Sequence, residues 1–190
     1  MATLVLEPTR RRITVDQYFV EVGETEERFE LIDGEIWQMA GGSREHAAVG
    51  RNLTAALFRK LAGGPCEPFG SDMAVEIDRW NFRYPDAAIY CDPRDLGPEA
   101  ATKQRLHHPK ILFEVLSPST ARIDRVGKVA EYKDLASVMA IVLVELGDRT
   151  IELHERQGPA AWLQRKIAVG DDLVLADPAL TLTAAEIFAG

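Results

Sequence analysis

The chain has 190 residues, 46% of them hydrophobic and 27% charged, a composition typical of a soluble globular protein with one core. No run approaches the roughly 20 apolar residues needed to cross a bilayer, and the first residues lack the apolar centre of a signal peptide. The net charge of −8 argues against broad nonspecific adhesion to nucleic acid. We therefore expect a cytoplasmic protein with no membrane contact, forming a single domain over residues 1–190 with a flexible N-terminus at 1–12.

The charges are unevenly distributed along the chain. Residues 21–35 carry seven acids and one base, whereas residues 102–133 carry seven bases and three acids. Because phosphate is repelled by the first segment and attracted by the second, we expect a polyanion to meet residues 102–133.

The first half of the chain predicts a helix, a hairpin and a longer helix. Thr14 can cap a short helix whose Tyr18 and Phe19 turn inward. Residues 28–32 and 35–39 then flank the turn pair Asp33-Gly34, which predicts a β-hairpin. From 43 to 61, apolar residues recur at helical spacing, and two glycines and a proline end the segment.

Strands dominate the second half. We expect strands at 72–77, 84–91 and 110–116, the last two central and buried on both faces, with a loop at 92–109. A helix at 122–135, with Ile123, Val126, Ala130 and Leu135 available for burial, precedes strands at 137–145, 150–155 and 161–169 and a final helix at 183–188. The strand–helix–strand order over 110–145 implies at least one parallel pair, so the chain predicts an α/β layer fold. Cys66 and Cys91 lie in different segments without CxxC spacing, so we interpret both as free thiols.

Two carboxylates stand inside apolar, strand-like runs. Asp86 follows Tyr84-Pro85, and Glu114 is the middle of the run 111–116. Since an unpaired buried charge is costly, such acids pair with a base or hold a metal ion. If the two strands are neighbours, the acids can share one cation, and oxygen-only ligation suits Mg²⁺ or Mn²⁺ better than zinc. Lys128, in the following helix, could reach the same place and help a water attack a phosphate.

These residues carry a resemblance to a known family. The Tyr84-Pro85-Asp86 triplet and the block Phe113 to Thr120, followed by Asp124, Arg125, Lys128, Glu131 and Tyr132, resemble the PD-(D/E)XK nuclease superfamily. The pattern is most similar to the Uma-two branch of restriction endonucleases, which residues 29–35 and His46 also match.

The resemblance implies a fold, a site and an activity. The fold would be restriction-endonuclease-like, a mixed β-sheet flanked by helices, with an N-terminal β-hairpin. Asp86 and Glu114 would hold Mg²⁺ (or Mn²⁺), Lys128 would be the catalytic lysine, and DNA phosphodiester hydrolysis, often in a homodimer, would be the activity. The superfamily's usual lysine position holds Leu116 here, so the amine would come from the next helix, as the branch's pattern suggests.

Further candidates have a functional and a structural interpretation side by side. Glu30 could be another acid of the site or an exposed hairpin residue, and His46 could contact substrate or be a core histidine. Arg125 could contact substrate or pair with Asp124, and Tyr132 could pack with its hydroxyl at the rim of the site. For the three central residues, the alternatives are a turn acid at Asp86, a buried ion pair at Glu114 and a solvated helix residue at Lys128.

The sequence leaves three functions open. The first is a metal-dependent endonuclease acting on DNA. The second is a noncatalytic binding or assembly module that retains the nuclease fold, favoured by the net charge and by Leu116. The third is hydrolysis of RNA or of a small phosphate ester by the same residues.

Overall fold

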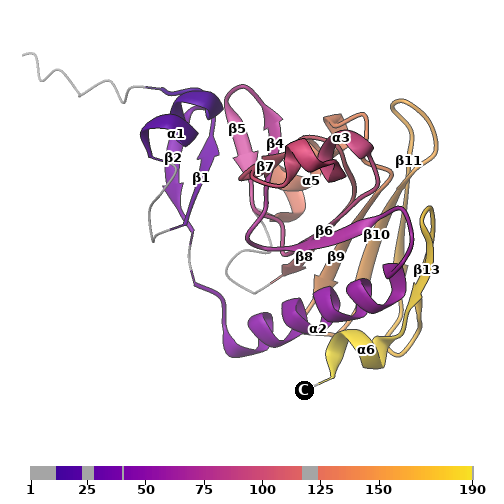
Figure 1. Cartoon of the computed structure of the whole chain (residues 1–190). Coiled ribbons are helices and arrows are strands. Elements are labelled where there is room, and N and C mark those ends of the chain that lie inside the picture. Colours follow the sequence, from indigo (N-terminus) through magenta and orange to yellow (C-terminus); the bar gives the residue numbers. More distant parts are fainter. Residues whose placement is uncertain (1–11, 23–27, 40, 117–123, 190) are drawn as a thin grey trace, which may run out of the picture.

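The fold is a mixed α/β arrangement in which helices flank two sheets (Figure 1). The computed structural model describes residues 12–22, 28–39, 41–116 and 124–189. These residues form a six-stranded sheet, a five-stranded sheet and a separate two-stranded hairpin. The predicted mixed α/β class with an N-terminal β-hairpin is therefore confirmed. The predicted flexible N-terminus lies outside the described residues, apart from Arg12, which pairs with Asp33 and stacks over Trp80.

The six-stranded sheet forms the centre of the molecule. Its strand order is β11-β10-β9-β8-β6-β3, and its only parallel pair joins β8 to β9, as the 110–145 pattern predicted. Its strands are β3 (Glu67–Gly70), β6 (Ala87–Tyr90), β8 (Pro109–Leu116), β9 (Ala140–Glu145), β10 (Ile151–Arg156) and β11 (Trp162–Ile167). Alternate residues of β8 enter two different cores: Ile111, Phe113 and Val115 pack in one and Leu112 and Leu116 in the other. The prediction that β6 and β8 are buried on both faces is therefore confirmed.

The five-stranded sheet contains the predicted hairpin. Its order is β2-β1-β5-β4-β7, with β1 (Phe29–Ile32), β2 (Glu35–Gln38), β4 (Ala74–Asp78), β5 (Asn81–Arg83) and β7 (Arg105–Leu106). Asp33 and Gly34 have φ angles of 51° and 77°, the left-handed backbone that a tight hairpin turn needs. A side chain at Gly34 would also meet the backbone oxygen of Ile13 at 3.0 Å, so glycine is required there for two reasons.

Helices cover both faces of the large sheet. The long helix α2 (Arg44–Leu61) runs along the bottom of the molecule, with α6 (Ala184–Phe188) beside it (Figure 1). Ser43 caps α2, and its Val49, Leu53, Leu57 and Leu61 are buried at the predicted helical spacing. The opposite face is covered by α5 (Val129–Asp134). The remaining short helices are α1 (Val15–Glu21), which Thr14 caps as predicted, α3 (Pro93–Leu96) and the 3₁₀ turn η1 (Pro98–Ala100). Among the described helices, none is both long and apolar enough to span a membrane.

The helix expected at 122–135 differs from its prediction. The chain forms a π-helical turn, η2 (Asp124–Lys128), before α5 begins, and residues 117–123 lie outside the described part. Of the residues expected to be buried, Val126 is 69% exposed and Ala130 is also exposed, whereas Lys128, Val129 and Tyr132 are buried. The wider turn changes which side chains face inward, so an ideal α-helical period selected the wrong face.

Several short strands were missed. The predicted strand at 84–91 is shorter in the structure: β5 ends at Arg83, before Pro85, and only Ala87–Tyr90 form β6, so Asp86 precedes β6 rather than lying within it. Proline cannot donate a ladder hydrogen bond, which explains the interruption. The edge strand β3 contains a proline and a glycine, which favoured a loop. The hairpin of β12 (Leu173–Ala176) and β13 (Ala179–Leu182) was also missed, although its leucines alternate.

The interpretation of the two cysteines as free thiols is wrong in this structure. Cys66 and Cys91 form a disulfide with a Cα–Cα distance of 4.1 Å. The two residues lie immediately beyond the paired positions Glu67 and Tyr90 of β3 and β6, so antiparallel pairing places them opposite each other. Because the sequence did not reveal β3, it could not reveal this proximity.

Candidate functional site

Asp86 immediately precedes β6, and Glu114 lies in the neighbouring strand β8. In the antiparallel pair β6–β8, Ala87 lies opposite Phe113, and one more step in the same register brings Asp86 opposite Glu114. The condition that the sequence set for a shared site, adjacent strands, is thus met. Asp86 is fixed by its own strand partner, because the backbone N–H of Val115 donates to Asp86 Oδ2 at 2.7 Å.

Glu114 is buried within a polar cluster. Its side chain is 3% exposed; the amine of Lys128 donates to Oε2 at 3.2 Å, and the hydroxyl of Tyr132 donates to Oε1 at 2.6 Å. Burial and the adjacent Glu114 carboxylate raise the pKa of Tyr132 well above its usual value, which keeps this hydroxyl a donor. Lys128 is therefore not a solvated helix residue; the π-helical turn places its amine against the strand acid.

Glu30 joins the same cluster from β1. Its Oε1 lies 3.4 Å from the amine of Lys128 and accepts a hydrogen bond from the backbone N–H of Tyr84 at 3.1 Å. Glu30 is buried, so the interpretation as an exposed hairpin residue is wrong. The amine of Lys128 thus lies between a carboxylate of the large sheet and one of the small sheet.

Arg83, which sequence reasoning missed, supports Glu30 from behind. Its guanidinium donates to Glu30 at 3.1 Å and to both oxygens of Glu131, at 2.6 and 2.7 Å. Burial opposes its charge, but the hydrogen bonds and charges of the two glutamates outweigh that cost and raise the pKa of Arg83. The local sequence Asn81 to Tyr84 alternates polar and aromatic residues, so it did not mark Arg83 as a charge inside an apolar run.

His46 approaches Asp86 from the opposite helix. Its Nε2 lies 3.4 Å from Asp86 Oδ2, so His46 belongs to the site rather than to the apolar core. The hydrogen bond to Asp86 raises the pKa of His46 above its usual value, against the opposing effect of partial burial. A protonated His46 places a positive charge beside Asp86, where a phosphate would approach.

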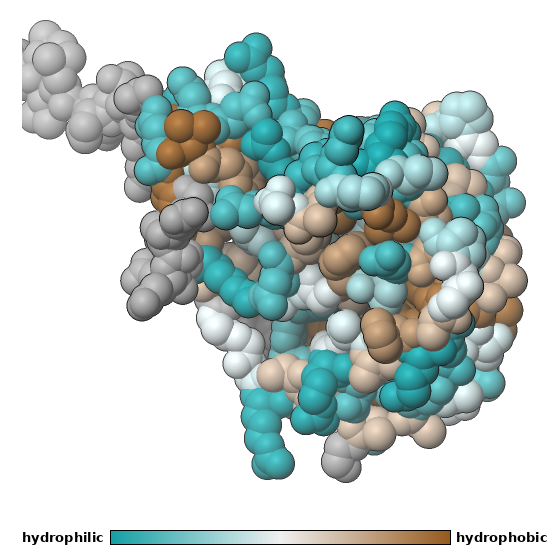
Figure 2. Space-filling view, viewed as in Figure 1, coloured by the Kyte–Doolittle hydropathy of each residue, from teal (hydrophilic) through white to brown (hydrophobic). Residues whose placement is uncertain are grey.

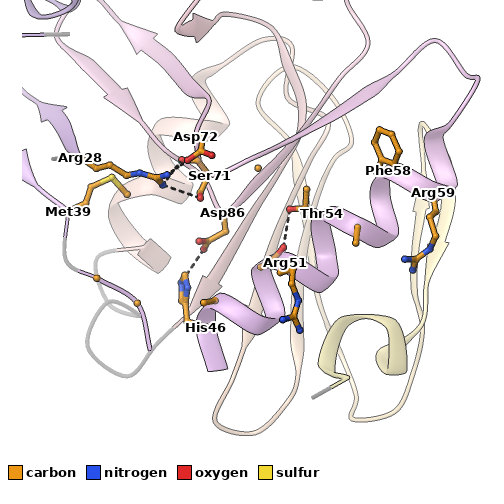
Figure 3. Close-up of a pocket in the computed structure, with 16 residues that line it drawn as sticks. Arg28, Met39, His46, Arg51, Thr54, Phe58, Arg59, Ser71, Asp72 and Asp86 are labelled. Atoms are coloured by element: carbon orange, nitrogen blue, oxygen red, sulfur yellow. Dashed lines mark hydrogen bonds and ion pairs between the residues drawn. The ribbon is translucent and has the colours of Figure 1, made fainter. Parts of the chain in front are cut away.

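A pocket of about 1060 Å³ opens between α2 and the loop before β4 (Figure 3). His46 and Asp86 point toward each other at one end of it, and three arginines, Arg28, Arg51 and Arg59, also line it. Hydrophilic side chains stand along this side of the molecule over α2 (Figure 2). Of the buried cluster, neither Glu114, Lys128 nor Glu30 lines the pocket, so Asp86 connects the open space to the buried charges.

The structure brings most predicted site residues together. Glu114, Lys128, Glu30 and Tyr132 share side-chain contacts, and the pair Asp86–His46 adjoins them through the backbone of Val115, whereas the side chain of Arg125 lies outside the described part of the chain. The bases of 102–133 whose side chains are described do not line the pocket; its arginines come from residue 28 and from α2, which the charge count did not single out. No group of three or more histidine, cysteine, aspartate or glutamate side chains at metal-binding distance occurs among the described residues.

Comparisons with known proteins agree with this fold. A solved structure titled as a putative nuclease belonging to DUF820, from Anabaena variabilis, superposes with a TM-score of 0.74, 17% identity, and coverage of 93% of this chain and 98% of that chain. The chain is 30% identical over 180 residues to the uncharacterized protein slr1290 of a Synechocystis strain, covering 94% of this chain and 93% of the relative. It is 26% identical over 156 residues to sll1609 of the same organism, covering 82% and 87%. The Uma2 model, described as "Putative restriction endonuclease", matches residues 15–185, and the chain therefore belongs to the Uma2 family.

Proposed function

We propose that this protein is a divalent-metal-dependent endonuclease that hydrolyses DNA phosphodiester bonds. The observation that carries the proposal is the contact of the Lys128 amine with Glu114 and Glu30, together with Asp86, which accepts from the backbone of Val115 beside Glu114 and lines a pocket that arginines also line. Membership of a family described as restriction endonucleases supports DNA as the substrate.

The residues of the site fit Mg²⁺ or Mn²⁺. Asp86 and Glu114 offer hard oxygen donors from adjacent strands, and Mg²⁺ commonly uses only one or two carboxylates, with waters and substrate phosphate as its other ligands. The lack of a three-ligand cluster among the described residues is compatible with such a site. When bound by Asp86 and Glu114, the ion would polarise the scissile phosphate and activate a water.

The protein's own residues would perform the remaining tasks. Lys128, held between Glu114 and Glu30, can orient the attacking water and offset the negative charge that develops on the phosphate. Protonated His46 can hold a phosphate oxygen beside Asp86, and the arginines of the pocket can hold neighbouring phosphates. Tyr132 and Arg83 fix Glu114 and Glu30, which pre-organises the amine.

The test is cleavage of plasmid and linear DNA with Mg²⁺ or Mn²⁺. We expect Asp86→Ala to abolish cleavage and Lys128→Met to lower its rate by about 100- to 1000-fold, because the amine acts where charge develops. The matched control is Asp72→Ala, which removes a carboxylate from the same pocket wall, where it pairs with Arg28. Equal cleavage by the wild type and Asp86→Ala would refute the assignment.

The second candidate is a noncatalytic binding module that retains this fold. It is favoured by one observation: both oxygens of Glu114 already have partners in the chain, Lys128 and Tyr132. Calorimetry with Mg²⁺ or Mn²⁺ distinguishes the two functions. Metal binding that is lost in Asp86→Ala supports the nuclease, whereas no heat of binding in a folded wild type supports the module.

A further inference from the structure

The helix α2 carries a basic surface that extends beyond Asp86 and His46. Its 18 residues include four bases and one acid, in a chain whose net charge is −8. Arg51 and Arg59 are exposed and line the large pocket, and neither forms an ion pair with any residue in the described segments. The Arg51 guanidinium donates only to the neutral side chain of Asn52, and exposed guanidinium groups without an ion pair are suited to a row of phosphates.

An exposed aromatic ring stands beside these arginines. Phe58 is 68% exposed, although it lies on a helix whose other large apolar residues are buried. It lines the large pocket and also a neighbouring hollow of about 400 Å³ formed by Leu61, the turn at 62–64 and the start of β3. Figure 3 shows the ring on the side of α2 away from the Arg51 guanidinium group. Because the ring and the two arginines nevertheless line one pocket, a strand in that pocket can place a base on Phe58 and its phosphates beside Arg51 and Arg59.

The groove continues from the candidate cleavage site. His46 and Asp86 line one end of the pocket, and Phe58 lies twelve residues after His46 on the same helix, or roughly 18 Å along its axis. A stacked strand rises by about 3.4 Å per nucleotide, so this length corresponds to about five nucleotides. A strand whose scissile phosphate lies at Asp86 would thus pass Arg51 and reach Phe58 and Arg59.

The ring indicates which form of DNA the groove accepts. In a duplex each base face is covered by the adjacent base pairs, so a protein ring can stack only on a base that is unpaired and unstacked. An electropositive groove combined with an exposed aromatic side chain is the arrangement that binds single strands without reading their sequence. We infer that the α2 groove binds a single-stranded DNA segment, with Arg51 and Arg59 on its phosphates and Phe58 stacked on a base. Only the placing of the scissile phosphate at Asp86 rests on the nuclease function proposed above.

Binding in EDTA tests this inference without requiring cleavage. Fluorescence anisotropy would compare labelled oligothymidylate, a mixed-sequence duplex of equal length and oligouridylate on the full chain. We expect oligothymidylate to bind tightest and Phe58→Ala to weaken it by about 5- to 150-fold, the range found for loss of one stacking ring. The double variant Arg51→Ala/Arg59→Ala should weaken binding of every polynucleotide. It should also reduce the slope of log affinity against log salt concentration by roughly 1 to 2.

Matched controls separate the groove from general surface effects. Trp37→Ala removes another exposed aromatic ring, on β2, and Arg165→Ala another exposed arginine, on β11, and both should leave the affinity unchanged. The inference would be overturned if the duplex bound at least as tightly as oligothymidylate, or if folded Phe58→Ala kept the wild-type affinity. Tighter binding of oligouridylate than of oligothymidylate would overturn the choice of DNA. Tight oligothymidylate binding without cleavage in Mg²⁺ would instead refute the nuclease proposal and leave this groove standing.

Discussion

The two carboxylate oxygens of Glu114 have different hydrogen-bond partners, which together fix the position of the side chain. Lys128 donates to Oε2 at 3.2 Å and Tyr132 to Oε1 at 2.6 Å, while the side chain is only 3% exposed. A carboxylate so deeply buried requires such partners, because its desolvation is otherwise uncompensated. The hydroxyl of Tyr132 therefore holds one oxygen of Glu114 in place while the other oxygen accepts from the amine of Lys128.

The residue-scale prediction concerns Tyr132→Phe. This change keeps the buried ring but removes the donor to Glu114, so we expect a loss of about 1–3 kcal/mol in the free energy of unfolding. Urea denaturation followed by circular dichroism measures it. The control is Tyr18→Phe, also buried, whose hydroxyl donates to none of the described residues. Equal destabilisation by both changes would show that the contact with Glu114 is energetically unimportant.

The elements that form the groove are held by contacts outside the site. The end of α2 is fastened to α6 by the pair Lys60–Glu186 at 3.0 Å, and Glu186 also completes the cap of α6 by accepting from the backbone N–H of Thr183 at 2.9 Å. The backbone hydrogen bond at Thr183, followed by the contact with Lys60, holds the pKa of Glu186 below its usual value. The position of the Phe58 and Arg59 turn of α2 thus depends on a carboxylate that must be ionised.

The element-scale prediction is a pH dependence at Glu186. A carboxyl whose pKa is lowered by folding adds stability above its unfolded pKa of about 4.3, and this stability disappears as the pH falls through the lower folded value. We therefore expect Glu186→Gln to lower the melting temperature at pH 7 and to match the wild type at the acid end of the range where both fold. Thermal melts across this range provide the measurement. A difference that grows toward acid pH would contradict the assigned sign.

On the scale of the whole molecule, the two sheets share a core. Val75 of β4 packs in the same apolar cluster as Leu112 and Leu116 of β8 and Ile141 of β9, and the Lys128 amine links Glu30 of one sheet to Glu114 of the other. Because apolar and ionic contacts both cross between the sheets, neither sheet completes its core alone. We therefore propose that the two sheets form one domain.

The whole-molecule prediction is that both sheets unfold together. Trp37 and Trp80 belong to the smaller sheet and its β4–β5 turn, and Trp162 belongs to the larger one. The variant Trp37→Phe/Trp80→Phe keeps only the fluorescence of the larger sheet, and Trp162→Phe keeps only that of the smaller sheet and its turn. Within each variant, we expect the urea midpoint measured by fluorescence to equal the midpoint measured by circular dichroism. Separate midpoints within one variant, by fluorescence and by circular dichroism, would indicate two independent units.

The sequence alone identified features whose signals are local. The cap at Thr14, the helices that start near 43 and 183, the Asp33-Gly34 turn and the apolar runs of β8 and β9 depend on neighbouring residues, so they could be predicted. Asp86 and Glu114 also stood out, because an acidic residue within an apolar run is inconsistent with its neighbours whatever the tertiary fold. Arg83 did not stand out in this way, because its neighbours alternate polar and aromatic residues.

The tertiary structure decided everything that required two distant segments to meet. The burial of Glu30 depends on Arg83 and Lys128, 53 and 98 positions away, and the groove combines Arg28 with α2. The π-helical turn at 124–128 and the disulfide between Cys66 and Cys91 were likewise invisible in local patterns. Local propensity reflects only interactions between residues near one another in the sequence. The contacts named here are stabilised when folding buries groups from distant parts of the chain together, away from water.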